Sequence, residues 1–161
     1  MGSVSSGESA RGRRQATVEI RGALRELSVQ LSLLNRKVGA RLELKDVDLD
    51  CLDLVNLHGP LSPSALARLA GLHPATMTGI VDRLERGGWV TRERDPSDRR
   101  GVQIRALRDR NAELLGLFAG MNTSLEQICA GYQEADLELI ADFLRRTTEA
   151  GRTANEGLTT E

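Results

Sequence analysis

The chain has 161 residues, enough for one compact domain, and its 22 basic and 23 acidic side chains nearly cancel to a formal net charge of −1. It contains no run of about 18 apolar residues and its polar start lacks the apolar centre of a signal peptide, so we expect a cytoplasmic protein without a membrane partner. Its cysteines, Cys51 and Cys129, lack CxxC spacing, and its two histidines are too few for a zinc site, so we predict structural thiols, no metal and no cofactor.

The charge is unevenly distributed along the chain. Residues 1–81 carry 10 basic and 8 acidic side chains, residues 82–110 carry 9 and 6, and residues 111–161 carry 3 and 9. Residues 99–108 contain four arginines and no acidic residue. Such a local positive patch suits phosphate groups, although a solvated arginine-rich loop explains the charge equally well.

Apolar periodicity predicts a long helix in the N-terminal part of the chain. Residues 1–16 are rich in Gly, Ser and Arg without an apolar period, so we expect a disordered arm there. From residue 20 onward, apolar side chains recur at alternating intervals of four and three, which indicates a helix with one face against other helices. That face comprises Ile20, Leu24, Leu27, Leu31, Leu34 and Val38. A second apolar segment, residues 47–57, ends before Gly59 and Pro60.

The middle of the chain is predicted to form two short helices in tandem. Ser62 and Pro63 suit an N-cap and a first-turn proline, and Gly71 suits the left-handed residue that ends a helix. A second helix is expected to begin at Pro74. The small Ala67, followed by Gly71, matches a helix-turn-helix, because a small residue lets the helices cross closely and glycine allows the tight turn. Many helical hairpins that bind nothing share this pattern.

The second of these helices is predicted to have distinct inward and outward faces. The buried face comprises Met77, Ile80, Val81 and Leu84. The outward face comprises Ala75, Thr76, Thr78, Gly79, Asp82, Arg83 and Arg86. It is small and hydroxylated where a solvated helix usually carries Glu and Lys. Gly79 costs about 1 kcal/mol relative to alanine inside a helix. Close approach of a base edge would explain why glycine stands there, and neutral sequence drift at an exposed position is the alternative explanation.

After residue 88 the apolar period changes to two, which predicts a β-hairpin. Trp89 and Thr91 oppose Val90 and Arg92 on the first strand, and Val102, Ile104 and Ala106 share one face of the second. The connecting residues, DPSDRRG, suit a turn with Arg99 and Arg100 near its tip. An arginine on a projecting hairpin can enter a minor groove at A·T tracts. Asp98 is the expected support, because its carboxylate can hold one of these arginines by a charge-assisted hydrogen bond.

The C-terminal part repeats the helical spacing of the N-terminal part. The repeat comprises Leu114, Phe118, Met121, Leu125, Ile128 and Tyr132, then, after a break at residues 131–134, Leu137, Ile140, Phe143 and Leu144. One small subunit cannot bury all these faces, so we expect dimerisation helices at about residues 17–44 and 109–148 and a two-fold homodimer. The expected dimer contacts are Ile20, Leu24, Leu27, Leu125, Ile128, Tyr132, Ile140 and Phe143. Residues 149–161 have no pattern and are expected to fray.

Residues 83–104, RLERGGWVTRERDPSDRRGVQI, resemble the end of the recognition helix and the wing of the MarR family. The DPSDRR wing after a glycine-ended helix is highly specific, and the order of helices matches that family over about residues 18–148. The resemblance implies a mainly α-helical dimer with a winged helix-turn-helix lobe, here about residues 47–107, within a single domain over residues 17–148. It also implies a transcriptional regulator, expected to be a repressor and not an enzyme, that binds a pseudo-palindromic site on double-stranded DNA.

The same resemblance implies which residues meet DNA. The base-facing positions are Thr76, Thr78, Gly79 and Arg83, the wing arginines are Arg99 and Arg100, and the phosphate-facing positions are Ser62 and Ser64. The sequence departs from the family's pattern at His73, where many members have a Ser or Thr cap. It also has Arg108 and Asn111 in place of the usual Thr and Gly, so we expect another residue, such as Asp109, to cap the following helix.

Within the family, small aromatic or phenolic effectors bind many members between the dimerisation helices and the lobe, but nothing in this sequence identifies one.

Three other functions are possible alternatives to DNA-binding regulation of this kind. The first is a cysteine-based redox sensor. Members that sense organic hydroperoxides have a reactive cysteine near the start of the first helix, which this chain lacks, and the apolar surroundings of Cys51 disfavour thiolate. A winged-helix protein-interaction module without DNA binding should lack the arginines that this chain retains. An enzyme is least supported, because no Ser, His and Asp set or carboxylate pair has a suitable context.

Overall fold

The computed structural model describes residues 4–98 and 101–159. The elements in chain order are α1 (Val4–Leu42), α2 (Asp46–His58), α3 (Pro63–Ala70), α4 (Pro74–Arg86), β1 (Val90–Arg94), β2 (Val102–Ala106), α5 (Arg108–Leu117), α6 (Ala119–Cys129) and α7 (Glu134–Thr159). The predicted fold class, mainly α with a small β-hairpin wing, is confirmed. The chain divides into two compact units, Met1–Asp46 and Val47–Glu161. None of the helices in the described ranges is long and apolar enough to cross a membrane.

Both terminal helices are longer than the sequence predicts. α1 includes residues 4–16, for which composition predicts a disordered arm, and α7 continues through residues 149–159, which are expected to fray. The Ala, Arg and Glu residues of these segments have high helix propensity, and a nucleated helix gains one backbone hydrogen bond for each further residue that it orders. The lack of an apolar period therefore removes a packing face but does not end the helix.

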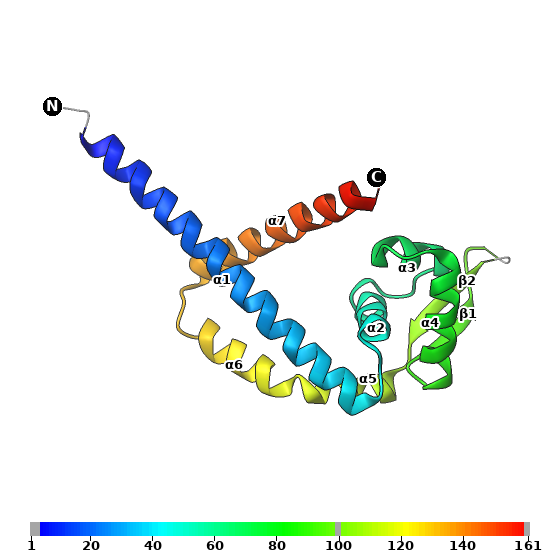
Figure 1. Cartoon of the computed structure of the whole chain (residues 1–161). Coiled ribbons are helices and arrows are strands. Elements are labelled where there is room, and N and C mark those ends of the chain that lie inside the picture. The colour runs from blue at the N-terminus through cyan, green and yellow to red at the C-terminus, as the bar shows by residue number, and fades with distance from the viewer. Residues whose placement is uncertain (1–3, 99–100, 160–161) are drawn as a thin grey trace. The chain divides into compact units, whose positions relative to one another are not determined.

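The core of the second unit lies where α2, α3, α4 and the hairpin meet (Figure 1). Its largest buried side chains include Leu49, Leu52, Val55, Leu66, Met77, Ile80, Val81, Leu84, Trp89, Val90 and Ile104. The predicted inward face of α4 is confirmed, because each of its four residues is at most 1% exposed. Burial of this face turns the opposite face of α4 towards solvent.

The turn between α3 and α4 has the predicted chemistry. Ser62 caps α3, its Oγ accepting a hydrogen bond from the backbone N of Ala65 at 3.2 Å, and Pro63 stands in the first turn. Gly71 ends the helix in the left-handed conformation, at φ 64°, where a side chain would be strained. Ala67 is 3% exposed, as a close crossing of two helices requires. The predicted helix-turn-helix is therefore confirmed.

Two helix starts lack the usual Ser or Thr cap. At α4 the Nδ1 atom of His73 accepts a hydrogen bond from the backbone N of Ala75 at 3.2 Å, so the imidazole takes the role of a Ser or Thr cap. At α5 no side chain caps the helix, so the predicted capping role of Asp109 is wrong. Asp109 lies inside the first turn instead, where its negative charge is favourable to the helix dipole.

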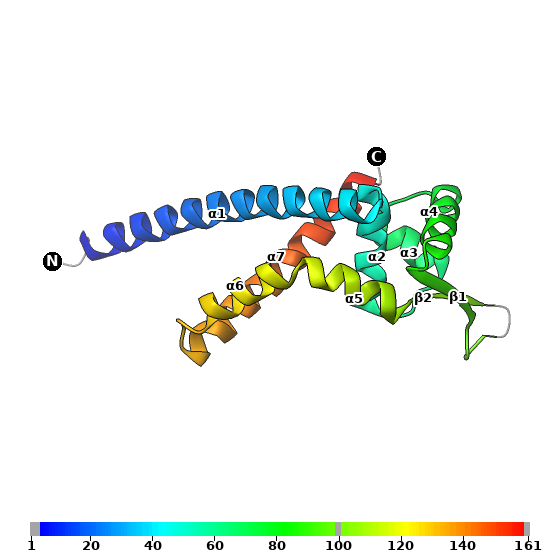
Figure 2. The ribbon, with the colours of Figure 1, turned by 90° about the horizontal axis from the view of Figure 1, so that it is seen from below.

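The two strands form an antiparallel hairpin that projects beyond the helices (Figure 2). Val90 pairs with Ala106 at its base, next to α4 and α5. Trp89, which the two-residue period assigns to the first strand, precedes β1 and is buried together with Val90. The strand begins one residue later than predicted because Gly88, at φ 73°, redirects the chain.

Two features of the fold are not visible in the sequence pattern. An isolated β-bridge joins Leu61 to Ile104 through backbone hydrogen bonds of 3.1 and 2.7 Å, which attaches the hairpin to the segment before α3.

The helical spacing of the C-terminal part suggests one continuous helix through Phe118, but the structure separates α5 from α6 at this residue (Figure 2). Gly116 and Gly120 flank this point, and glycine is a weak helix former.

Candidate nucleic-acid interface

The N-terminus of α3 presents two serine hydroxyls. The Oγ of Ser62 caps the helix and lies 3.1 Å from the Oγ of Ser64. Ser64 is exposed and Ser62 is half-buried. Because the backbone N–H groups and the dipole at a helix N-terminus favour an anion, this end of α3 suits the predicted phosphate contacts.

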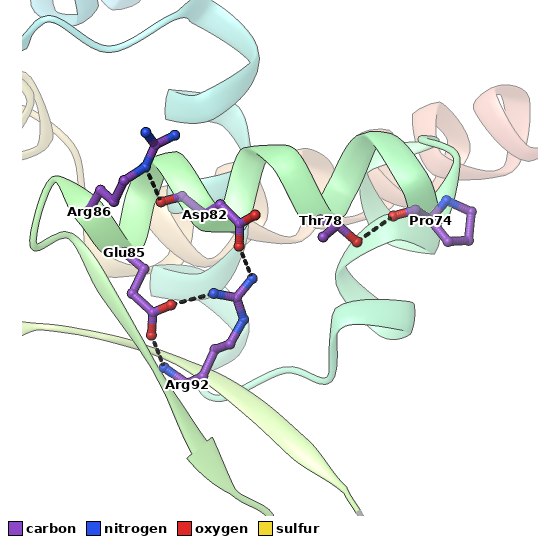
Figure 3. A network of polar contacts seen from close by, with 6 residues as sticks. All are labelled: Pro74, Thr78, Asp82, Glu85, Arg86 and Arg92. Atoms are coloured by element: carbon purple, nitrogen blue, oxygen red, sulfur yellow. Dashed lines mark hydrogen bonds and ion pairs between the residues drawn. The ribbon is translucent and has the colours of Figure 1, made fainter.

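The outward face of α4 leaves the helix backbone accessible. Thr76 and Thr78 are exposed, and the Thr78 hydroxyl donates a hydrogen bond to the carbonyl of Pro74 at 3.2 Å (Figure 3). A Cβ on Gly79 would meet a single neighbour within 4 Å, the Nη1 of Arg83 at 3.7 Å. The surface over Gly79 is therefore open to a base edge or a sugar.

Arg83 makes a contact that the sequence analysis missed. Its Nε donates to Oδ2 of Asp48 at 2.9 Å, and its Nη2 donates to Oδ1 at 2.6 Å. The Asp48 side chain is 4% exposed and that of Arg83 is 35% exposed, so the carboxylate lies inside and the guanidinium at the surface. The hydrogen bonds with Asp48 raise the pKa of Arg83 above its ordinary value. Arg83 thus stands on the predicted outward face, but a residue of α2 sets its orientation.

Arg92 ties β1 of the hairpin to α4 (Figure 3). Its guanidinium donates to Asp82 at 2.5 Å and to Glu85, and its backbone N donates to Glu85 Oε1 at 3.0 Å. These contacts, with Asp82 first, raise the pKa of Arg92. They offset part of the negative charge of two acidic groups of α4 and hold β1 in a defined position relative to that helix.

The tip of the wing lies outside the described residues. The roles of Arg99 and Arg100, and of Asp98 as their support, therefore stay predictions. The two described residues that flank the tip are bonded to each other: the backbone N of Gly101 donates to the carbonyl of Asp98 at 2.9 Å.

Asp95 organises the described part of the wing loop. Its Oδ1 accepts hydrogen bonds from the backbone N and the hydroxyl of Ser97 at 2.7 and 2.6 Å, and its Oδ2 accepts one from Gln103 at 2.9 Å. The bonds from Ser97 and Gln103 lower the pKa of Asp95. An aspartate that bonds to the backbone two residues later forms an Asx turn, a signal in DPSD that the sequence analysis passed over.

Asn111 anchors the base of the wing. Its Oδ1 accepts a hydrogen bond from Asn56 at 2.8 Å, and its Nδ2 donates to the carbonyls of Trp89 and Leu107 at 3.1 and 2.6 Å. The guanidinium of Arg110 stacks on the Trp89 ring, 4.2 Å from its centroid. Asn111 therefore joins α2, the residue before β1 and the residue before α5.

The environment of Cys51 disfavours a reactive thiolate. Cys51 is fully buried, and burial raises the pKa of its thiol to about 11, with Asp50 and Asp48 adding to the shift. Because the thiolate is the form that reacts, the redox-sensor alternative loses support. Cys129 is a half-buried free thiol. Within residues 4–98 and 101–159, no group of three or more His, Cys, Asp or Glu could hold a metal ion.

Two sets of large apolar side chains are exposed. In α1, Ile20 and Leu27 are each 42% exposed, and Leu24 is half-buried. In α6, α7 and the turn between them the set comprises Leu125, Ile128, Tyr132, Ile140 and Phe143, which are 38 to 58% exposed. These residues are the ones predicted to form the dimer contact, and large apolar side chains that gather at a surface often mark an interaction site.

Comparison with known proteins gives consistent matches. The model of the MarR family matches residues 44–102. The HTH-type transcriptional regulator YcgE of Bacillus subtilis is 34% identical over 125 residues, which are 78% of this chain and 81% of that protein. The crystal structure of transcriptional regulator Tm0710 from Thermotoga maritima has a TM-score of 0.60 and 27% identity, over 82% of this chain and 93% of that one. A MarR family protein from Bacillus stearothermophilus has the same fold, with a TM-score of 0.63 and 21% identity over 85% of this chain and 96% of that one.

Proposed function

The chain belongs to the MarR family of winged helix-turn-helix transcriptional regulators, and from this premise we propose that it represses transcription as a homodimer bound to a specific operator. The observation that carries the proposal is the outward face of α4, where Thr76, Thr78 and Gly79 leave the backbone accessible beside a wing held by Arg92. An α-helix with such a face fits the major groove, and a basic hairpin beside it reaches the minor groove.

The DNA contacts in this proposal divide into three groups. The base-reading positions are Thr76, Thr78, Gly79 and Arg83, the minor-groove positions are Arg99 and Arg100, and the phosphate positions are Ser62 and Ser64. Phosphate contacts hold the protein in register, and base contacts choose the sequence.

The exposed apolar faces of α1, α6 and α7 support the homodimer. Two subunits related by a two-fold axis present two recognition helices, so the operator is expected to be pseudo-palindromic with half-sites roughly 34 Å apart. A dimer that covers promoter DNA in the cytoplasm would block transcription. Release by a small-molecule effector, as in many relatives, is part of the same proposal.

Selection of bound duplexes from a random pool, at stated salt concentrations, tests this function. Two inverted half-sites and a steep fall of affinity with salt are expected, because phosphate contacts release counterions. A protected footprint without two-fold symmetry would contradict the symmetric dimer. Failure to enrich any sequence would favour the protein-interaction module. The selected duplex then serves in a screen for small molecules that release it.

A further inference from the structure

We propose that Asp48 of α2 is a positioning residue that directs the guanidinium of Arg83 at a guanine in each half-site. The inference rests on the proposed function and deepens it, because it names a base and the buried carboxylate behind the contact.

The ion pair leaves the base-reading edge of Arg83 available. Asp48 occupies the side edge of the guanidinium, through Nε at 2.9 Å and Nη2 at 2.6 Å. Of the five N–H donors of an arginine, those left include the two parallel N–H groups at the end of the side chain, on Nη1 and Nη2. This pair matches O6 and N7 of guanine, the commonest specific contact of arginine in the major groove.

The position of the pair on the protein also favours contact with DNA. The Asp48 carboxylate is 4% exposed and cannot reach DNA, whereas Arg83 is 35% exposed on the outward face of α4. Gly79, one turn earlier on that face, has no side chain to cover the guanidinium, and the Cβ that it lacks would lie 3.7 Å from Nη1. A base can therefore approach Nη1 over Gly79.

Asp48 is expected to act on base choice more than on total affinity. It holds a side chain with many rotamers in one geometry before DNA binds, so less conformational entropy is lost in the complex. It also compensates the charge of Arg83, which weakens the attraction of that arginine for phosphates in general. An Arg83 without this partner would be free to contact phosphates of any sequence.

In the opposite arrangement, Asp48 would withhold Arg83 from DNA, and Asp48→Asn would then tighten operator binding without changing the base preference. The experiment measures affinity of the full chain for its selected operator, for duplexes with each other base at the guanine position, and for an unrelated duplex, at two salt concentrations. We expect Asp48→Asn to reduce the preference for guanine by about 10-fold, since a bidentate contact discriminates on that scale. Affinity for the unrelated duplex should stay the same or rise. Tighter operator binding with unchanged preference, or an equal loss on all four bases, would overturn the proposal.

Matched variants separate positioning from a general effect on the fold. Asp53→Asn makes the same chemical change in the same helix and should keep the guanine preference. Arg83→Gln should lose the preference, and adding Asp48→Asn to it should cause no further loss. If Asp48→Asn lowered the guanine preference of the Arg83→Gln variant as much as that of the unmodified chain, Asp48 would act on the fold alone, and the inference would be overturned.

Two further points keep the test decisive. Asp48→Glu retains the charge but moves the carboxylate by one methylene group, so it should lose guanine preference even if Asp48→Asn does not fold. Melting curves of every variant establish which of them are folded. An unmodified chain that enriches no duplex contradicts the proposed function itself, whereas an operator-binding chain whose Asp48 variants keep the guanine preference contradicts this inference only.

Discussion

The indole of Trp89 packs directly on the backbone of Gly87. A Cβ at position 87 would lie 2.7 Å from Cδ1 and 2.9 Å from Nε1 of the ring, closer than atoms can pack. Gly87 follows the last residue of α4, and Trp89, which is 2% exposed, immediately precedes β1. The contact therefore joins the end of α4 to the start of the hairpin.

Gly87→Ala should lower the free energy of unfolding by about 1–3 kcal/mol, because a buried ring must move to admit the methyl group. Urea denaturation measures the change. Gly116→Ala is the control, since a Cβ there has no neighbour within 4 Å, and alanine should be neutral or stabilising by up to about 1 kcal/mol. Equal effects of the two substitutions would show that the Trp89 contact is not the cause.

Gly79→Ala should separate stability from DNA binding. The new Cβ would stand 3.7 Å from Nη1 of Arg83, an ordinary contact, and alanine in a helix is favoured by about 1 kcal/mol. The variant should therefore melt at a higher temperature and yet bind the operator more weakly, because its methyl group fills the surface that DNA approaches. Unchanged operator affinity in a more stable variant would favour drift at an exposed site.

Changing Leu125 and Ile128 together to glutamate should yield monomer or aggregate, because charge on the exposed apolar face of α6 opposes its burial in a dimer. Light scattering at micromolar concentration gives the molecular mass. Gln127→Glu adds charge to the same helix at a polar position and should leave the dimer intact. A stable folded monomer of the unmodified chain would refute the dimer.

The wing arginines should act through the width of the minor groove. Arg99→Ala or Arg100→Ala should weaken binding mainly to operators with A·T flanks, where a narrow groove concentrates negative potential. Affinities for A·T-flanked and G·C-flanked operators, with melting of each variant, provide the measurement. If affinity fell equally for both kinds of operator and melting were unchanged, these arginines would make general phosphate contacts. If affinity did not fall, they would not contact DNA.

Asp53 should make stability depend on pH. Burial, aided by Asp50, raises its pKa from 3.8 to about 6 in the folded protein, so the folded state binds this proton more tightly than the unfolded state does. The contribution of Asp53 to stability therefore improves as the pH falls through 6, reaches its full value near 4, and is unfavourable at pH 8. Asp53→Asn should therefore raise the free energy of unfolding at pH 8. The shift in pKa sets an upper bound of about 3 kcal/mol, and the gain should be smaller because the group is partly exposed. Denaturation at pH 8 and pH 4.5 should show that this advantage shrinks; a constant advantage would contradict the prediction.

Local features of the fold could be predicted from the sequence alone. The cap at Ser62, the left-handed Gly71 and the buried face of α4 depend on residues within one or two helical turns, and all were found where expected. The hairpin was expected for the same reason, since a two-residue period and a turn sequence lie next to each other in the chain. The helix ends at residues 4–16 and 149–159 were missed, because propagation of a helix needs no apolar period.

The polar contacts that orient the interface were decided by the tertiary structure. Asp48 and Arg83 are 35 residues apart, Asn56 and Asn111 are 55 apart, and nothing in either segment indicates its partner. Such pairs form because packing of the apolar faces brings two polar groups to the same buried place, where each needs a hydrogen bond. The sequence thus determined which face of α4 points outward, whereas the tertiary structure decided that Asp48 of α2 holds the arginine on that face.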